Sequence, residues 1–121
     1  MKNTIIVTGG AGFVGSNLIE HLIKVSKYKI ISLDNYSSGS KKNHIINKRV
    51  NYLKGDTSKI KKILEKYKNK IHTIFHFGEF ARIFQSFKKF DECYQSNSIG
   101  SKAVFKFCLD NNIKLDRKSV V

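Results

Sequence analysis

Four short runs of apolar, largely β-branched residues are spaced along the chain and separated by polar stretches. Runs of this kind, bounded by Gly, Asn, Asp or Ser, are typical of buried strands. They lie at Ile5–Val7, Lys29–Asp34, Val50–Lys54 and Thr73–Phe77. A fifth run, Ile113–Leu115, also begins like a strand. Because Asp116, Arg117 and Lys118 follow it at once, we expect the fifth strand to be poorly formed.

Helical periodicity fills the longer segments between these runs. Between Gly12 and Val25, apolar residues recur at helical spacing and predict one amphipathic helix. Its expected buried face consists of Val14, Leu18, Leu22 and Val25. A second helix is predicted from the spacing of Ile60, Ile63, Leu64 and Tyr67, and a third over about Asp91–Asn111. The third helix is expected to end at Asn111–Asn112, because asparagine tolerates the left-handed conformation that ends helices.

Strands that alternate with helices predict a parallel sheet with right-handed crossovers. No internal repeat, proline or linker suggests a second domain, so residues 1–121 are expected to form one α/β domain. The expected fold is a Rossmann-like, three-layer, doubly wound parallel sheet. We expect it to be truncated after about the fourth strand and the helix that follows. The edge of the fourth strand would then be exposed and open to a partner.

A glycine loop joins the first strand to the first helix. Gly9 would allow a tight turn, Gly12 would let a pyrophosphate approach the backbone, and Gly15 would let the helix pack close to the sheet. Free N–H groups and the positive end of the helix dipole would then face the phosphates. The candidate cofactor contacts in this loop are Gly9, Gly12, Phe13, Val14 and Gly15. A glycine-rich turn that binds no ligand is the alternative.

An acidic residue follows the second strand at the distance that this motif requires. Asp34 lies 19 residues after Gly15, close to the offset at which a carboxylate accepts hydrogen bonds from the adenosine ribose. Its charge would repel a 2′-phosphate, which favours NAD over NADP. Asn35 could share these contacts. A loop aspartate that only caps a turn is the alternative for Asp34.

A second acidic residue, Asp56, comes just after the third strand. At the carboxyl edge of the sheet it is well placed for a hydrogen bond to the adenine amino group, and its neighbour Thr57 is a further candidate contact. The alternative is an aspartate favoured by the dipole at the start of a helix. One residue can fill both roles.

The formal net charge of +14 suggests nucleic-acid binding at first sight. The excess consists of 20 Lys against only 3 Arg, and Lys, Ile and Asn are abundant while Ala occurs 3 times, a bias typical of an AT-rich coding sequence. The denser patches, Lys41–Arg49 and Lys59–Lys70, lack the pattern of aromatic and arginine side chains that reads bases. We therefore expect a solvated lysine-rich surface and no specific nucleic-acid partner.

Other classes of protein are disfavoured by what the chain lacks. No apolar run approaches the length of a membrane span, and the first residues resemble a strand, not a signal peptide. Cys93 and Cys108 have no metal-type spacing, and the four histidines form no metal site with them. We expect a cytoplasmic protein with free thiols, no metal and no membrane contact.

Together these segments resemble the extended short-chain dehydrogenase/reductase family, in particular its NAD-dependent sugar-nucleotide epimerases and dehydratases. Thr8–Ser16 matches the family's Thr-Gly-x-x-Gly-Phe-x-Gly-Ser loop, Asp34–Gly39 its Asp-Asn-x-x-x-Gly segment, and Gly55–Asp56 its adenine contact. The resemblance implies NAD as cofactor and a nucleotide-sugar as substrate of a full-length parent. A homodimer is a further possibility.

Two later motifs of the family match less closely. Ile74–Glu79 stands where the family has a strand and then His-x-Ala-Ala along the cofactor, which implies contacts from Phe77 and Gly78, although Glu79 departs from the small residue. Tyr94–Ser101 resembles the Asn-x-x-Gly-Thr helix motif. It implies a cofactor-side role for Asn97, with Gly100 in close packing beside a cofactor loop. A tolerated polar pair at a helix–sheet contact is the alternative.

The catalytic pair of the family is missing from this sequence. The family uses a Tyr-x-x-x-Lys pair, in which Tyr is the acid/base and Lys lowers its pKa. None of the five tyrosines here has Lys four residues later, so no catalytic residue is assigned and turnover by this chain alone is not expected. A truncated or frameshifted gene product would explain this. Three hypotheses follow: an NAD-binding part of an epimerase or dehydratase, an inactive nucleotide-binding or interaction module, and a basic nucleic-acid binder.

Overall fold

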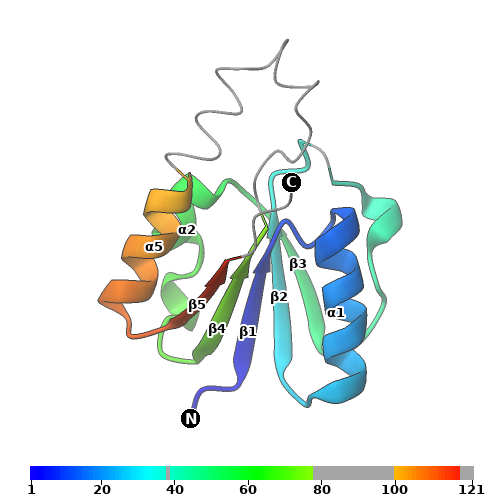
Figure 1. The fold of residues 1–121 in the computed structure, drawn as a ribbon, viewed down its shortest axis with the longest axis horizontal. Coiled ribbons are helices and arrows are strands. Elements are labelled where there is room, and N and C mark those ends of the chain that lie inside the picture. Colours follow the sequence, from blue (N-terminus) through cyan, green and yellow to red (C-terminus); the bar gives the residue numbers. More distant parts are fainter. Residues whose placement is uncertain (38, 78–99, 118–121) are drawn as a thin grey trace.

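Five parallel strands form one sheet in the order β3-β2-β1-β4-β5. The structure, a computed structural model, describes residues 1–37, 39–77 and 100–117. The strands are β1 (Thr4–Thr8), β2 (Lys29–Asp34), β3 (Val50–Lys54), β4 (Ile71–His76) and β5 (Lys114–Arg117). All five point the same way, with their carboxyl ends at the top of Figure 1. The strand order reverses between β1 and β4, so the topological switch point of this doubly wound sheet lies between the carboxyl ends of these two strands.

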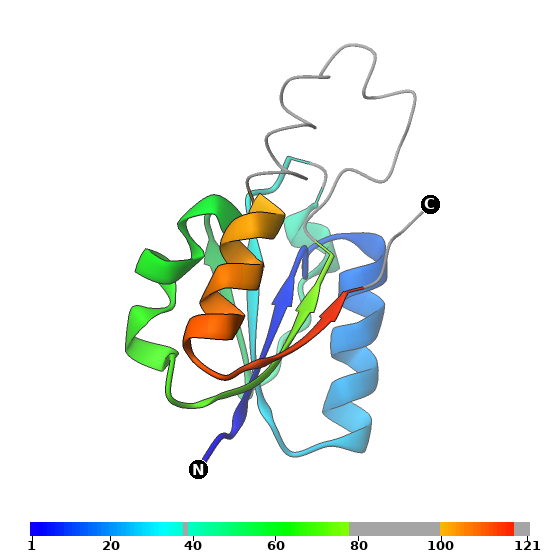
Figure 2. The same cartoon turned by 60° about the vertical axis from the view of Figure 1, so that its left-hand side comes forward.

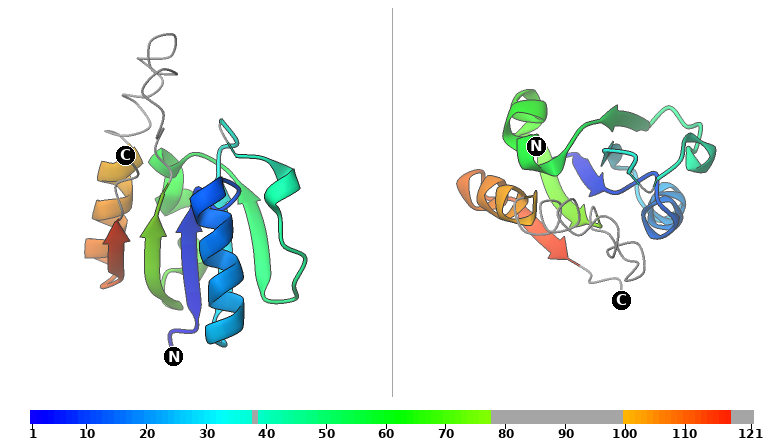
Figure 3. Two further views of the ribbon diagram at one scale, coloured as in Figure 1. Left: turned by 45° about the vertical axis from the view of Figure 1, so that its right-hand side comes forward. Right: turned by 90° about the horizontal axis from the view of Figure 1, so that it is seen from above.

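Helices cover both faces of this sheet and give three layers. The α-helices are α1 (Phe13–Val25), α2 (Ile60–Ile63) and α5 (Ser101–Asp110). Short 3-10 turns lie at Lys41–Asn43, Thr57–Lys59 and Glu65–Tyr67. The view from above in Figure 3 shows α1 on one side of the sheet and α2 and α5 on the other. The predicted Rossmann-like, doubly wound fold is therefore confirmed.

The inner strands β1, β2 and β4 are largely buried on both faces, because their side chains alternate between two cores. On β1, Ile6 points into the core beneath α2 and α5, whereas Ile5 and Val7 point into the core beneath α1. The α2/α5 core is the larger, with Leu64, Val104 and Phe107 among its buried members. All five residues of β1 are buried, so the central strand anchors both layers.

The predicted buried face of α1 is wrong in part. Val14 and Val25 are 38% and 63% exposed, whereas Ile19 is fully buried and Leu22 nearly so. The helix is rotated so that Gly15, Ile19 and Leu22 face the sheet. The cause lies at the start of the helix, where Gly15 must face the glycine loop, as the site geometry below shows.

The helix predicted around residues 60–67 is only partly regular. A 3-10 turn at Thr57–Lys59 leads into the four-residue α2, and a second 3-10 turn at Glu65–Tyr67 follows. Ile60 and Leu64 are fully buried, so the apolar spacing was identified correctly.

The end of α5 was predicted correctly. Asn111 is the C-cap residue, and Asn112 has a positive φ of 54°. The N–H of Ile113 donates to Cys108 O at 2.9 Å, and the N–H of Asn112 reaches Leu109 O at 3.5 Å. This pair of bonds is a Schellman motif, which satisfies the last carbonyl groups of the helix. Of the third predicted helix, residues 91–99 lie outside the described part of the chain.

A fifth strand forms in spite of its charged residues, contrary to expectation. The strand β5 includes Asp116 and Arg117 and pairs with β4, so β4 does not form the edge that was expected to be exposed. Figure 2 shows β5 beside β4 at the margin of the sheet. Leu115 packs against the α2/α5 core. Asp116, next to it, is only partly buried, and an edge strand meets water on its open side.

Two further expectations concern the cysteines and membranes. Cys108 is a free, buried thiol, and burial raises its pKa to about 11. It is therefore protonated and unreactive at neutral pH. Cys93 lies outside the described residues.

In the part of the chain that the structure describes, no helix has the length and apolarity needed to cross a membrane.

Two substitutions on α1 test the observed phase of the helix. Ile19→Ala removes a fully buried side chain and should lower the free energy of unfolding by about 2–4 kcal/mol. Val25→Ala removes an exposed one and should change it by less than about 0.5 kcal/mol. Urea unfolding followed by circular dichroism measures both. If Val25→Ala lowered the free energy of unfolding more than Ile19→Ala, the result would support the buried face predicted from the sequence and contradict the observed one.

Candidate functional site

The glycine loop leaves the carboxyl end of β1 and turns sharply at Gly9. Gly9 has φ = 72°, a conformation that side-chain-bearing residues rarely adopt. Its N–H donates to Leu33 O on β2 at 2.8 Å, and its carbonyl accepts the N–H of Gly12 at 3.0 Å. The predicted role of Gly9 in a tight turn is thus supported by its geometry.

The glycines of the loop differ in what surrounds them. A Cβ on Gly15 would lie 2.3 Å from Gly9 O and 2.9 Å from Gly10 Cα, so the missing side chain lets α1 pack close to the loop at the end of β1. A Cβ on Gly10 would lie 2.1 Å from Ser32 Oγ. Among the described residues, a Cβ on Gly12 would meet only Gly9 O, at 3.3 Å. Open space beside Gly12 fits the predicted approach of a pyrophosphate.

The amino end of α1 has no cap of its own. Gly12 is the N-cap residue, no side chain in the described part of the chain caps the helix, and no acidic residue stands in its first turn. Phe13 is 80% exposed at this end of the helix. The first N–H groups of a helix have no partner within the helix, so this end offers donors and a positive dipole to an anion.

Asp34 holds the glycine loop against β2. Its Oδ2 accepts the N–H of Ala11 at 3.0 Å, and its Oδ1 accepts the N–H of Tyr36 at 2.8 Å. A Cβ on Gly39 would lie 2.6 Å from Oδ2, so a glycine is needed for the loop to fold back over the carboxylate. Asp34 is only 8% exposed. It therefore caps a turn, as the alternative proposed, and also fixes the loop beside which a ribose would lie.

Ala11 connects the loop to the segment after β2, and sequence analysis did not single it out. Besides the N–H bond to Asp34, its carbonyl accepts the N–H of Ser40 at 3.0 Å and Nδ2 of Asn43 at 2.8 Å. The side chain is fully buried. The available signal was that alanine is rare in this chain and one of the three stands inside the glycine motif.

An aromatic cluster supports the segment after Asp34. Tyr36 has a positive φ of 61°, and its hydroxyl lies 2.7 Å from Nε2 of His44. His44 stacks on Tyr52 with ring centroids 3.8 Å apart. Burial, and then the negative charge of Asp34, raise the pKa of the Tyr36 hydroxyl. The phenol therefore stays protonated at neutral pH and can donate to His44.

Several predicted residues meet in a small cavity at the carboxyl ends of β1, β2 and β3. Its volume is about 10 Å³. Its lining consists of Gly9, Leu33, Asp34, Asn35, Gly55 and Thr57. Asp56 is exposed and does not line it. It accepts the N–H of Ser58 at 3.1 Å and so caps the turn that follows, which supports the alternative proposed for this residue.

Thr57 is buried and lies against the first turn of α5. A Cβ on Gly100 would stand 2.2 Å from Thr57 Oγ1, so the two segments touch here. Gly100 is therefore at a site of close packing, as the family motif implied. Its motif partner Asn97, like Gly78, lies outside the described residues.

The end of β4 meets the end of β1 at the switch point. The N–H of Phe77 donates to Thr8 Oγ1 at 2.9 Å and to Thr8 O at 3.1 Å. Phe77 is partly buried against the core beneath α1. The structure thus places Phe77 one residue beyond β4, beside the base of the glycine loop.

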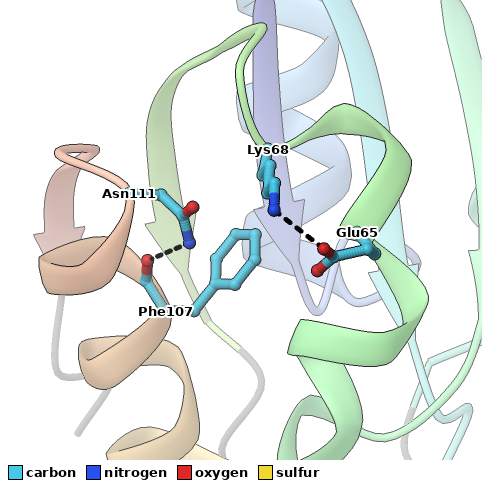
Figure 4. Close-up of polar contacts among 4 residues, drawn as sticks. All are labelled: Glu65, Lys68, Phe107 and Asn111. Carbon is cyan, nitrogen blue, oxygen red and sulfur yellow. Dashed lines mark hydrogen bonds and ion pairs between the residues drawn. The ribbon is translucent and has the colours of Figure 1, made fainter.

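A wider groove lies elsewhere, between α2 and α5. It has a volume of about 480 Å³ and an apolar floor that includes Phe107. Figure 4 shows its ion pair, in which Lys68 Nζ lies 2.8 Å from Glu65 Oε1, and the bond from Asn111 to Phe107 O. The hydrogen bond from Lys68 lowers the pKa of Glu65. None of the predicted cofactor residues that the structure describes lines this groove.

Two glycine substitutions test the packing of the loop. Gly15→Ala would push a Cβ into backbone atoms and should lower the free energy of unfolding by about 1–3 kcal/mol. Gly12→Ala meets only one atom at 3.3 Å and should cost less than about 1 kcal/mol. Thermal unfolding of the two variants beside the wild type measures this difference. Equal losses would show that Gly15 does not govern the approach of α1.

Comparison with known proteins places this geometry in a family. The model of the NAD dependent epimerase/dehydratase family matches residues 5–120. The UDP-glucose 4-epimerase of Pasteurella multocida is 33% identical over 105 residues, covering 80% of this chain and 30% of that protein.

Solved structures agree with this match. An epimerase of Methanothermobacter thermautotrophicus has a TM-score of 0.85 at 26% identity, over 96% of this chain and 34% of that one. The UDP-glucose 4-epimerase of Thermotoga maritima, solved with UDP-glucose, has a TM-score of 0.82 at 26% identity, over 94% and 37%. The chain spans about a third of the length of these proteins. Because the family model covers nearly all of its residues, the chain belongs to the NAD dependent epimerase/dehydratase family.

Proposed function

We propose that residues 1–121 form an NAD-binding Rossmann domain that serves a nucleotide-sugar epimerase or dehydratase. NAD is the cofactor of the family. The observation that carries the proposal is the buried carboxylate of Asp34, which is bonded to the glycine loop and lies beside the uncapped end of α1. A ribose acceptor and a diphosphate cradle thereby stand next to each other.

The residues present fit a dinucleotide in three ways. Asp34 and Asn35, at the end of β2, are placed to accept the adenosine ribose hydroxyls, with Thr57 in the same cavity. The space beside Gly12 admits the diphosphate, and the N–H groups at the start of α1 would stabilise its charge. Phe13 and Val14, exposed at this helix end, would cover it. Asp56 is proposed to contact the adenine from the edge of this site.

The reaction belongs to a larger protein in this proposal. When bound, NAD supplies a hydride acceptor for transient oxidation of a sugar. The role proposed for the chain itself is to bind and orient the cofactor. No turnover is expected from it, because none of its tyrosines is followed four residues later by lysine. The same observation favours a second candidate, a nucleotide-binding module without turnover. NAD binding is common to both, whereas epimerisation of a nucleotide-sugar by the chain alone would exclude the second.

The first test is cofactor binding by isothermal titration calorimetry. We expect the chain to bind NAD and to prefer it to NADP by about tenfold or more, because Asp34 would repel the 2′-phosphate. Asp34→Ala should weaken NAD binding by about tenfold and reduce the preference for NAD. Asp110→Ala, which removes an exposed charge on α5, is the matched control and should leave both values unchanged.

Two outcomes contradict the proposal. One is the absence of NAD binding by a wild-type chain that circular dichroism shows to be folded. The other is an equal affinity for NAD and NADP in the wild type that Asp34→Ala does not alter. The ratio of the two affinities is informative even if Asp34→Ala lowers the folded fraction, because both ligands are affected alike by unfolding.

A second test distinguishes damage to the proposed diphosphate site from damage to the fold. Gly12→Ala should remain folded, yet its methyl group would occupy the space proposed for the diphosphate. NAD affinity should fall by about tenfold or more, since a clash in a close-packed site has a cost of about 1–3 kcal/mol. Adenosine, which has no phosphate, should bind Gly12→Ala as it binds the wild type. Unchanged NAD affinity in this variant would place the diphosphate elsewhere.

A further inference from the structure

A further cavity lies at the amino ends of β1, β2 and β3, at the opposite edge of the sheet from the proposed cofactor site. The amino ends of the strands are at the bottom of Figure 1. The volume of the cavity is about 260 Å³, and we refer to it as the amino-edge cavity. No acidic residue of the described part of the chain lines it, whereas four cationic residues do: Lys29, Lys48, Arg49 and Lys70.

Backbone hydrogen bonds fix the segments that carry these cations. Lys29 begins β2, Arg49 precedes β3 and Lys70 precedes β4. The N–H of Asn3 donates to Lys70 O at 2.9 Å, and the N–H of Lys29 donates to Asn3 O at 2.9 Å. The N–H of Ile30 donates to Arg49 O at 2.7 Å. The lining is therefore preorganised, and a ligand has to order only the lysine side chains.

The guanidinium group of Arg49 is held in place by carbonyl groups at the end of α1. Its Nη1 donates to Ser26 O at 2.7 Å and to Tyr28 O at 3.2 Å, and its Nη2 donates to Ile23 O at 2.6 Å. These bonds satisfy the last carbonyl groups of α1 and the turn that follows. A positive charge therefore stays at this edge of the sheet at all times, and the lysines supply the groups that can reach a ligand.

The lysines of the amino-edge cavity have no acidic partners. None of the three forms an ion pair with a described residue. The groove between α2 and α5 differs, because Lys68 pairs there with Glu65, and Lys106 with Asp110. A high lysine content accounts for lysines at both places, but not for the lack of acidic groups at one of them. Like charges around one cavity repel each other, and a bound anion relieves this repulsion.

We propose that the amino-edge cavity binds a small phosphorylated anion. A phosphorylated group with two or three charges neutralises several ammonium groups at once, whereas a carboxylate neutralises one, and lysine binds phosphate as a point charge. The cavity is smaller than the roughly 300–1,000 Å³ of sites for drug-sized ligands, which favours a compact group such as pyrophosphate. Single-stranded nucleic acid requires an extended groove with aromatic platforms. The inference is independent of the proposed function, because the two cavities share no lining residue.

The experiment is a titration of the full ¹⁵N-labelled chain with pyrophosphate, followed by NMR at about physiological ionic strength. We expect the amide signals of Lys29, Asn51 and Lys70 to shift along one binding curve. Pyrophosphate can also occupy the diphosphate site proposed beside Gly12. The signals of residues 9–15 are therefore fitted separately, so that each place has its own dissociation constant.

Two exposed lysines of the cavity provide the variants. Lys48→Gln and Lys70→Gln should each weaken pyrophosphate binding at the amino-edge cavity by about three- to fivefold, and the double variant by about tenfold or more. Lys102→Gln removes the same charge from an exposed position on α5 and is the matched control, which should change this affinity by less than about twofold. Circular dichroism checks that each variant is folded.

Three results would overturn the inference. Shifts confined to residues 9–15 would mean that the only phosphate site is the one at the glycine loop. An equal loss of affinity in Lys102→Gln and Lys48→Gln would show diffuse attraction to the net charge. Tighter binding of a short single-stranded oligonucleotide than of pyrophosphate at the same signals would identify a different class of ligand. A chain that binds pyrophosphate at the amino-edge cavity and fails to bind NAD contradicts the proposed function alone.

Discussion

The backbone of the glycine loop and the first turn of α1 touch each other, because Gly15 has no Cβ to keep them apart. This contact sets the rotation of α1 about its axis. It brings Ile19 and Leu22 under the helix and leaves Val14 at the surface. The same close approach aims the uncapped end of the helix past the carboxyl end of β1. The packing of the core and the proposed anion site therefore both depend on the absence of one methyl group.

On the β2 side, the site is held together by main-chain groups more than by side chains. Ala11 uses its N–H for Asp34 and its carbonyl for Ser40 and Asn43. Two amide donors hold the carboxylate in one orientation. Its hydrogen-bonding capacity is not exhausted, because each oxygen can accept more than one hydrogen bond. The acceptor proposed for a ribose is therefore preorganised, so that little ordering would be required on binding.

The sequence predicts the sheet well and the helix packing less well. Runs such as Lys29–Asp34 are found as expected, because strands buried on both faces are continuously apolar. The phase of α1 is not encoded in periodicity, since Val14 and Ile19 are both apolar and only the contact of Gly15 decides between them. Ala11 could not be identified from its side chain, because its bonds are made by groups that nearly every residue has. The strand β5 forms because pairing with β4 outweighs its charged residues.

The contact between Thr8 and His76 joins residues 68 positions apart. The central strand β1 is made first during synthesis, yet its neighbour β4 emerges long after β2 and β3. Contacts between distant segments form slowly, because the entropy of closing the intervening loop is lost before they stabilise the chain. In a nascent chain, the edge of β1 that pairs with β4 therefore stays unpaired until residue 76 has left the ribosome. The adenosine side of the site can assemble while the chain is still growing, and the opposite side is completed last.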